Sequence, residues 1–323
     1  MSNVLWPPPP SGGLESLGKH HTETEAHELE WLVAAAQDTL RSLKAGLEEC
    51  ATLLAPRESG STLVLSSQRS ESLKGFVTLN GTRIVKGDVQ LRLVSLPPPR
   101  GQTAFRLAVS SSATASTLVI AQLVSARTLI NACLDVVDAT SWTGDTTNAH
   151  YISSQFRLLF ENIQEARQAL QGGAEQAKAW HQDPVDRNAF DPPLPPSLSL
   201  YFYVAEEGLI LAVRTLEPIG DGASGASTPT GSYAASTYSG LRIRDRLAAA
   251  LGAAPASHHH DEAEEVFTFR GQRVRVREKL RIETQDPSLM AALAKLRALE
   301  HSVALMRRAL DVVMGVEGDT DDS

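Results

Sequence analysis

The hydrophobic positions of this chain follow two periods, one typical of helices and one typical of strands. Over four long stretches, apolar residues recur in alternating steps of three and four, which aligns them in one stripe of a helix. Four stripes of similar length predict a bundle with left-handed, near-antiparallel packing. The stripes are Leu29, Val33, Ala36, Leu40, Leu43, Leu47, Cys50 and Leu54; Val119, Leu123, Ala126, Ile130, Cys133 and Val137; Ile152, Phe156, Leu159, Ile163, Ala166 and Leu170; and Leu289, Ala292, Leu296, Leu299, Val303, Met306, Leu310 and Val313, the last opened by the helix-start sequence DPS.

Segments of β character fall into two groups, one after the first stripe and one after the third. The first group contains STLVLSS, LKGFVTLNG, TRIVKGDVQLRLV and TAFRLAV, and the second contains LSLYFYVA, GLILAVRTL, EVFTFRG and QRVRVREKLRIE. Asn80-Gly81 lies between two alternating runs and predicts a hairpin turn, because both residues accept positive φ. The same turn explains the glycosylation-like triplet NGT without any need for a sugar.

The clearest β signal is the pair LSLYFYVA and GLILAVRTL, joined by AEEG. Both runs are apolar at almost every position, so we expect two strands that are buried on both faces at the centre of the β part. In the turn, Gly208 is expected to occupy the left-handed position of a type I turn with a bulge.

The order of elements predicts an α+β protein, because helices and strands are segregated along the chain. We expect an elongated two-lobed molecule in which an antiparallel helical bundle adjoins a separate, mainly antiparallel β lobe, each built from both halves of the chain. The predicted bundle comprises residues 22–55, 113–172 and 287–315, and the predicted β lobe comprises 61–110, 197–218 and 264–284. The remaining segments are a disordered tail at 1–21, a Ser/Gly-rich linker at 219–262 and an acidic tail at 316–323.

Composition narrows the class of protein. The net charge is −8, from 30 basic and 38 acidic residues, which argues against a general nucleic-acid binder because phosphate contacts need a positive field. Cys50 and Cys133 lie in separate apolar stretches and are expected to be buried free thiols. The start MSNVLWPPPPSGG has neither the basic residues nor the apolar run of a signal peptide, and no stretch approaches the roughly 18 apolar residues of a membrane span. We therefore expect a cytoplasmic protein.

Candidate catalytic and metal-binding motifs are weak. Gly220, Gly222 and Gly225 match a dinucleotide-binding spacing, but the following ASTPTGSY does not start a helix that could meet a pyrophosphate. The run His258–Glu262 contains three adjacent histidines at the linker edge, without the rigid spacing of zinc ligands, and is expected to be a solvated loop. We predict no catalytic residue, no metal and no cofactor.

Period two in RGQRVRVREKLRIE is expected to put its cations on one face of a strand and mostly apolar residues on the other. These cations are Arg273, Arg275, Arg277, Lys279 and Arg281. Two interpretations stay open: a solvated sheet face paired with neighbouring acids, or a docking surface for an acidic partner or an anionic membrane surface.

Several of these segments, in this order, resemble the Rogdi family, the small subunit of the RAVE complex (regulator of vacuolar and endosomal ATPase). They are ELEWLVAAAQDTLRSLKAGLEECATLL, SLKGFVTLNGTRIVKGDVQLRL, QLVSARTLINACLDVV and LPPSLSLYFYVAEEGLILAVRTLEPI, followed by the closing strands and helix. The similarity spans roughly residues 28–313 and is broken mainly by the linker near 221–262. We expect a fungal member.

The resemblance implies a non-catalytic adaptor with a helical bundle joined to a β domain. Its implied partners are a large WD-repeat subunit and the peripheral sector of the vacuolar proton-pumping ATPase, whose rejoining with the membrane sector the complex promotes. It implies a cytoplasmic protein that is recruited to vacuolar and endosomal membranes only through its partners. The alternative from the heptad stripes alone is a self-associating coiled-coil scaffold without a role at the pump, since such seams pair between chains as readily as within one.

Overall fold

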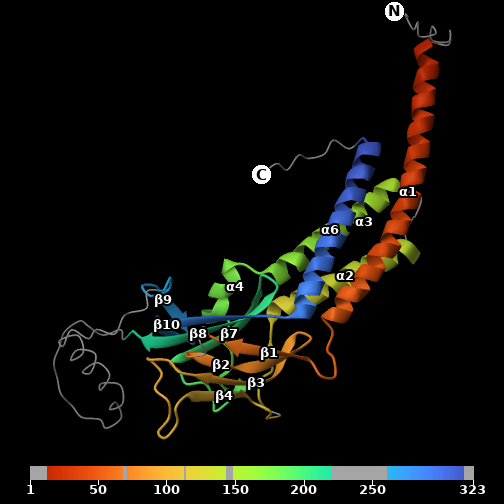
Figure 1. The fold of residues 1–323 in the computed structure, drawn as a ribbon. Coiled ribbons are helices and arrows are strands. Elements are labelled where there is room, and N and C mark those ends of the chain that lie inside the picture. The colour runs from red at the N-terminus through yellow and green to blue at the C-terminus, as the bar shows by residue number, and fades with distance from the viewer. Residues whose placement is uncertain (1–12, 68–70, 113, 143–147, 220–259, 316–323) are drawn as a thin grey trace, which may run out of the picture.

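The protein is seen in a computed structural model that describes residues 13–67, 71–112, 114–142, 148–219 and 260–315. It is a mixed α/β structure with long helices at one end and two antiparallel sheets at the other (Figure 1). The helices are α1 (Gly13–Leu53), α2 (Ala121–Trp142), α3 (Ala149–Gln171), α4 (Ala174–Lys178) and α6 (Pro287–Val313), with short 3-10 turns η2 (Ala179–His181) and η3 (Arg187–Ala189). Helix α1 packs against α2 and α6, and α3 packs against α2 and α6.

The predicted stripes form most of the buried face of these helices. In α3 every predicted position is buried, and the helix begins where the Asn148 side chain accepts a hydrogen bond from the Tyr151 backbone N–H at 3.1 Å. Helix α6 begins as the sequence DPS predicts: the Asp286 carboxylate accepts from the backbone N–H groups of Ser288 and Leu289, and Pro287 occupies the first turn. These caps satisfy N–H groups that the helix itself leaves unpaired.

Two helix starts differ from the prediction. Helix α1 begins at Gly13, inside the predicted disordered tail 1–21, and extends past the ends of α3 and α6 (Figure 1). The last proline before it is Pro10, and the following GLESLGKHH offers good helix formers such as Leu, Glu and Lys. The second bundle segment was predicted from residue 113, but Val119 lies in a short strand and is half exposed, so the buried stripe of α2 begins at Leu123.

The first sheet has the strand order β1-β2-β3-β4-β6, with β5 paired to β3. Its strands are β1 (Ser61–Ser66), β2 (Leu73–Asn80), β3 (Arg83–Leu91), β4 (Phe105–Val109), β5 (Leu118–Val119) and β6 (Phe190–Asp191). A hairpin joins β2 and β3 as predicted, but its turn is displaced by one residue. Asn80 pairs with Arg83, so the loop is Gly81-Thr82, and Gly81 has a φ of 60° whereas Asn80 stays in the strand without a positive φ. The pairing of β6 with β4 brings residues from the second half of the chain into this sheet.

The second sheet has the order β7-β8-β10-β9, formed by β7 (Leu198–Ala205), β8 (Gly208–Pro218), β9 (Val266–Phe269) and β10 (Gln272–Gln285). Strands β7 and β8 are the predicted hairpin and are buried along nearly their whole length. The turn differs from the prediction. Ala205 pairs directly with Gly208, so the loop is Glu206-Glu207, and these two residues have φ values of 50° and 73°. Two left-handed residues match the twist of the flanking strands better than a type I turn.

The hairpin is buried on both faces because different layers cover each one. One face, with side chains such as Phe202 and Leu209, belongs to the main core, whereas the other, with Tyr203 and Ile210, belongs to smaller apolar clusters. Trp180 of η2 lies in one of these clusters and is fully buried. The prediction of a strand pair buried on both faces is confirmed, but only β8 lies inside its sheet, because β7 is an edge strand.

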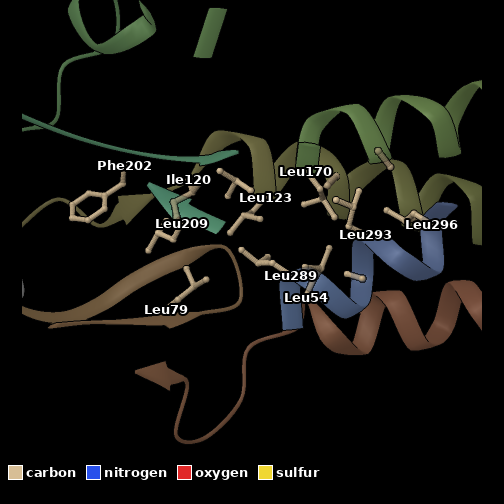
Figure 2. Packing of buried hydrophobic residues seen from close by; sticks show 14 of the residues in the cluster. Leu54, Leu79, Ile120, Leu123, Leu170, Phe202, Leu209, Leu289, Leu293 and Leu296 are labelled. Atoms are coloured by element: carbon tan, nitrogen blue, oxygen red, sulfur yellow. The ribbon is translucent and has the colours of Figure 1, made fainter. Parts of the chain in front are cut away.

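A single hydrophobic cluster continues from the long helices into both sheets. Figure 2 shows the junction, where Leu54, Leu289 and Leu170 of the helical segments meet Leu79 and Leu209 of the two sheets. The helices and sheets thus share one core, which differs from the prediction of a separate β lobe. The apolar ends of the helices and the inner sheet faces exclude water together.

The junction is also fastened by polar and backbone contacts on β7. The side-chain amide of Gln122 accepts from Val204 N–H at 2.7 Å and donates to Val204 C=O at 2.8 Å, thereby covering part of the open edge of the sheet. At the end of α3, Gly172 has a φ of 65°, and a Cβ there would lie 2.3 Å from the Val204 oxygen. Only glycine permits this close approach.

Candidate functional site

The strand with the predicted row of cations is β10. Arg273, Arg275 and Arg277 are exposed and alternate with the buried side chains of Val274 and Val276. The first half of the strand therefore has the predicted two-sided character.

A β-bulge prevents all five cations from lying on one face. The pairing of β10 with β8 shifts between Val276 and Glu278, so that Arg277 is the additional residue. Directly paired residues of neighbouring strands point to the same side. Before the bulge Arg275 is opposite Glu217, and after it Lys279 is opposite Arg214, which belongs to the other face. A bulged residue reverses the in-out alternation, and a strict period of two cannot reveal it.

Lys279 and Arg281 consequently lie on the face that carries Val274 and Val276. The Lys279 side chain is mostly buried and donates to both oxygens of Asp261, at 2.7 and 2.8 Å, and to Glu262 Oε1 at 2.7 Å. Arg281 approaches Glu283 at 3.6 Å. Of the predicted surface, Arg273 and Arg275 remain together, with Arg277 at the bulge.

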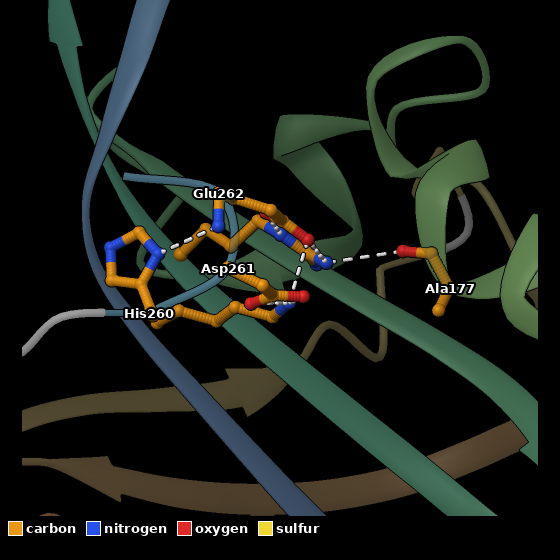
Figure 3. A network of polar contacts seen from close by, with 6 residues as sticks. Ala177, His260, Asp261 and Glu262 are labelled. Atoms are coloured by element: carbon orange, nitrogen blue, oxygen red, sulfur yellow. Dashed lines mark hydrogen bonds and ion pairs between the residues drawn. The ribbon is translucent and has the colours of Figure 1, made fainter. Parts of the chain in front are cut away.

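The polar group to which Lys279 belongs is centred on a buried ion pair. Arg214 donates from Nε to Glu262 Oε2 at 2.6 Å and from Nη2 to Glu262 Oε1 at 2.7 Å, and the two side chains are only 1% and 5% exposed. Nη2 also donates to the carbonyl of Ala177 at 3.1 Å. Figure 3 shows Ala177, Asp261 and Glu262 converging from the α4 segment and from the loop before β9. The arrangement is bidentate, the strongest form of an arginine–carboxylate pair.

The Trp180 side chain covers one side of this network. The Arg214 guanidinium lies over the Trp180 ring, with Cζ 4.8 Å from the ring centroid. Trp180 is packed in turn against Phe267 and Phe269 of β9. A cation over an indole face is attracted by its quadrupole, and more strongly when water is excluded. The contact thereby links η2 to the centre of the second sheet.

The neighbouring cations lower the pKa of both carboxylates, Glu262 and Asp261. Burial by itself would raise the pKa of Glu262, but hydrogen bonds from Arg214 and Lys279 outweigh it and bring the pKa below its ordinary value. The hydrogen bond from Lys279 likewise lowers the pKa of Asp261. Both groups are therefore charged at neutral pH, and each oxygen of Glu262 already accepts from a cation. Such a paired carboxylate is suited to hold the loop in place.

Within the described residues 260–262, this finding corrects the prediction of a solvated loop for Glu262, whereas the Asp261 side chain is 75% exposed. His260 accepts a hydrogen bond from the Glu262 backbone N–H at its own Nδ1 (3.2 Å), and Glu262 is buried. Glu262 is buried although it follows a polar linker, because the buried Arg214 needs a counter-charge. His258, His259 and the glycine pattern Gly220, Gly222 and Gly225 lie outside the described residues.

Sequence reasoning considered Glu262 only as part of the histidine run, and it missed Arg214, Trp180 and the ion pair. The one available signal was Arg214 itself, a charged residue inside the apolar run GLILAVRTL, because an arginine is almost never fully buried without a partner. Its partner is 48 positions away. No local pattern identifies a contact across that separation.

Within the described ranges, His, Cys, Asp and Glu side chains form no group of three or more that would hold a metal ion. In the same ranges, every helix is too short or too polar to cross a bilayer.

With long helices and two antiparallel sheets around one core, the protein has a mixed α/β fold. A buried arginine–glutamate pair lies on the outer face of one of the sheets. The family model described as "Rogdi leucine zipper containing protein" matches residues 28–311. This match covers most of the chain, and the protein belongs to that family. A comparison with curated proteins gives no match.

Proposed function

We propose that this chain is a non-catalytic adaptor subunit of a RAVE-like complex that promotes assembly of the peripheral and membrane sectors of the vacuolar proton-pumping ATPase. The observation that carries the proposal is the family match over residues 28–311, which takes in the long helices and both sheets. The adaptor role itself follows from what the Rogdi resemblance implies.

In this proposal the chain contributes binding surfaces, while ATP hydrolysis and proton transport belong to the pump. Its partners are a large WD-repeat subunit and the free peripheral sector. It is cytoplasmic and reaches vacuolar and endosomal membranes through these partners. Arg273 and Arg275 are exposed on one face of β10 and would meet an acidic surface of a partner, where complementary charge speeds association and fixes orientation.

The test is a pull-down of the tagged chain from cells of its source organism, once with the pump assembled and once after its dissociation. We expect recovery of a WD-repeat protein in both states and of the peripheral sector mainly after dissociation. The proposal would be overturned if neither a pump component nor a WD-repeat protein is recovered in either state.

A second candidate is a self-associating scaffold, and one observation favours it. Trp31 of α1 and Leu305 and Val312 of α6 are 72%, 52% and 78% exposed, so the helices carry apolar side chains that a second chain would cover. Light scattering over a range of concentrations separates the candidates. A stable dimer that recovers no pump component supports the scaffold, whereas a monomer that recovers them supports the adaptor.

A further inference from the structure

The connection between β3 and β4 carries an exposed proline run. It includes Leu96-Pro97-Pro98-Pro99-Arg100, in which Leu96 is buried and all three prolines and Arg100 are exposed. The function proposed above makes no use of this segment.

Local chemistry gives the run an extended, left-handed polyproline II conformation. Each proline ring holds φ near −65°, and each residue before a proline is kept out of the helical region. Leu96, Pro97 and Pro98 all precede a proline, so the backbone has little choice but one turn of polyproline II helix. Since the backbone is pre-ordered, a partner loses little entropy in binding it.

The start of the run is anchored to the second sheet. Leu93 and Leu96 are buried and form an isolated antiparallel bridge with each other. Between them, Ser95 donates from its backbone N–H and from its hydroxyl to Glu278 Oε2, at 3.2 and 2.7 Å, and its hydroxyl lies 2.6 Å from that of Thr215. The residues that precede the prolines are therefore held in a fixed position on the protein.

The end of the run is also defined. Gln102 N–H donates to the Pro99 carbonyl at 3.0 Å, and Gly101 has a φ of 83°. A positive φ at the third residue of a four-residue turn is the signature of type II. Arg100 occupies the second position and follows the last proline directly, so a cation stands at one end of the run.

We propose that Pro97–Arg100 is a ligand for a proline-binding module, a small domain whose aromatic side chains line a groove for a polyproline II turn and whose rim carries carboxylates. Such grooves take up proline rings because the helix is pre-formed and its backbone carbonyls remain free. The exposed guanidinium of Arg100 selects a module with an acidic rim. The proposal is independent of the adaptor role, since it requires neither the pump nor a WD-repeat subunit.

The experiment presents the full chain to a panel of purified SH3, WW and EVH1 domains and measures affinity by titration calorimetry. We expect at least one acidic-rimmed domain to bind, the triple variant Pro97→Ala, Pro98→Ala, Pro99→Ala to lose at least tenfold in affinity, and Arg100→Glu to lose a comparable factor. Unchanged thermal unfolding of the variants shows that the loss is local. Should the triple variant unfold, Arg100→Glu and the single variant Pro98→Ala decide the question.

The matched control replaces Pro7–Pro10 of the tail sequence WPPPP with alanine, which should leave the affinity unchanged. Three results overturn the proposal: no domain binds, binding survives the replacement of Pro97–Pro99, or binding is lost in the tail variant alone.

Discussion

Arg214 and Glu262 form a bidentate ion pair that is almost completely shielded from water, with both nitrogen–oxygen distances at or below 2.7 Å. The pair joins β8, an inner strand of the second sheet, to the chain that enters β9. Removing one partner of a buried pair leaves an uncompensated charge and strongly lowers the free energy of unfolding. Replacing both partners by apolar residues costs far less.

We therefore expect Glu262→Ala to lower the free energy of unfolding by about 3–5 kcal/mol. The double variant Arg214→Leu, Glu262→Leu should recover much of this loss, since Arg214 and Glu262 are removed together and Lys279 keeps Asp261 as its partner. Urea unfolding of the two variants and the native protein measures both effects. Arg157→Ala, which breaks the exposed pair with Glu161, is the control and should cost less than about 0.5 kcal/mol. A Glu262→Ala variant as stable as this control would contradict the buried-pair account.

The same pair predicts how stability depends on pH. The pKa of Glu262 is lower in the folded protein than its ordinary value, so near pH 4 the folded state binds fewer protons than the unfolded chain. The stabilisation is fully present above the unfolded-state pKa, about 4.3, and is lost as the pH falls through the folded-state pKa. The stability difference between the native protein and Glu262→Gln should narrow between pH 6 and pH 3. A constant difference in unfolding free energy across this range would count against the assignment.

Gly172 provides a test of the junction between α3 and β7. Gly172→Ala introduces a Cβ 2.3 Å from the Val204 oxygen in a conformation with positive φ, so the backbone must move. Gly271→Ala is the matched control, because φ there is 78° and no atom lies within 4 Å of the new Cβ. We expect the control to cost about 1–2 kcal/mol from left-handed strain alone and Gly172→Ala to cost clearly more. Equal losses in thermal unfolding would show that the close approach is unimportant.

The two thiols are expected to be inert in the folded protein. Burial raises the pKa of Cys50 to about 11 and that of Cys133 to about 12, whereas an exposed cysteine has a value near 8.5. At pH 8 about one Cys50 thiol in a thousand is ionised, and only the thiolate reacts. Ellman's reagent should label neither residue in native buffer and both in guanidinium chloride. Rapid labelling under native conditions would reveal an opening of the helical core.

Charge reversal on β10 separates its two faces. Arg275→Glu combined with Arg277→Glu should weaken recovery of the large partner while changing the unfolding free energy by less than about 1 kcal/mol, since exposed charges contribute little to stability. Arg281→Glu makes the same kind of replacement at one position on the opposite face and should leave recovery unchanged; the single variant Arg275→Glu matches it in charge and should weaken recovery. If all variants recover the partner equally, the exposed arginines of β10 form only a solvated sheet face.

The helical stripes, the β7–β8 hairpin and the Asp286 cap were predictable because each depends on neighbours within one or two turns or on a single tight loop. A period of three and four identifies a buried helix face, and an unbroken apolar run identifies a strand covered on both sides. The core positions Phe156, Leu159 and Ile163 follow directly from such spacing.

Tertiary structure alone decided three other features. The bulge at Arg277, in the pairing of β10 with β8, reverses which side the later cations face. Arg214 meets Glu262 across 48 positions, and the core continues from the helices into both sheets. All three features depend on which surfaces pack together and exclude water once distant segments meet. Because hydrophobic burial is non-directional, the order of residues along the chain does not determine this packing.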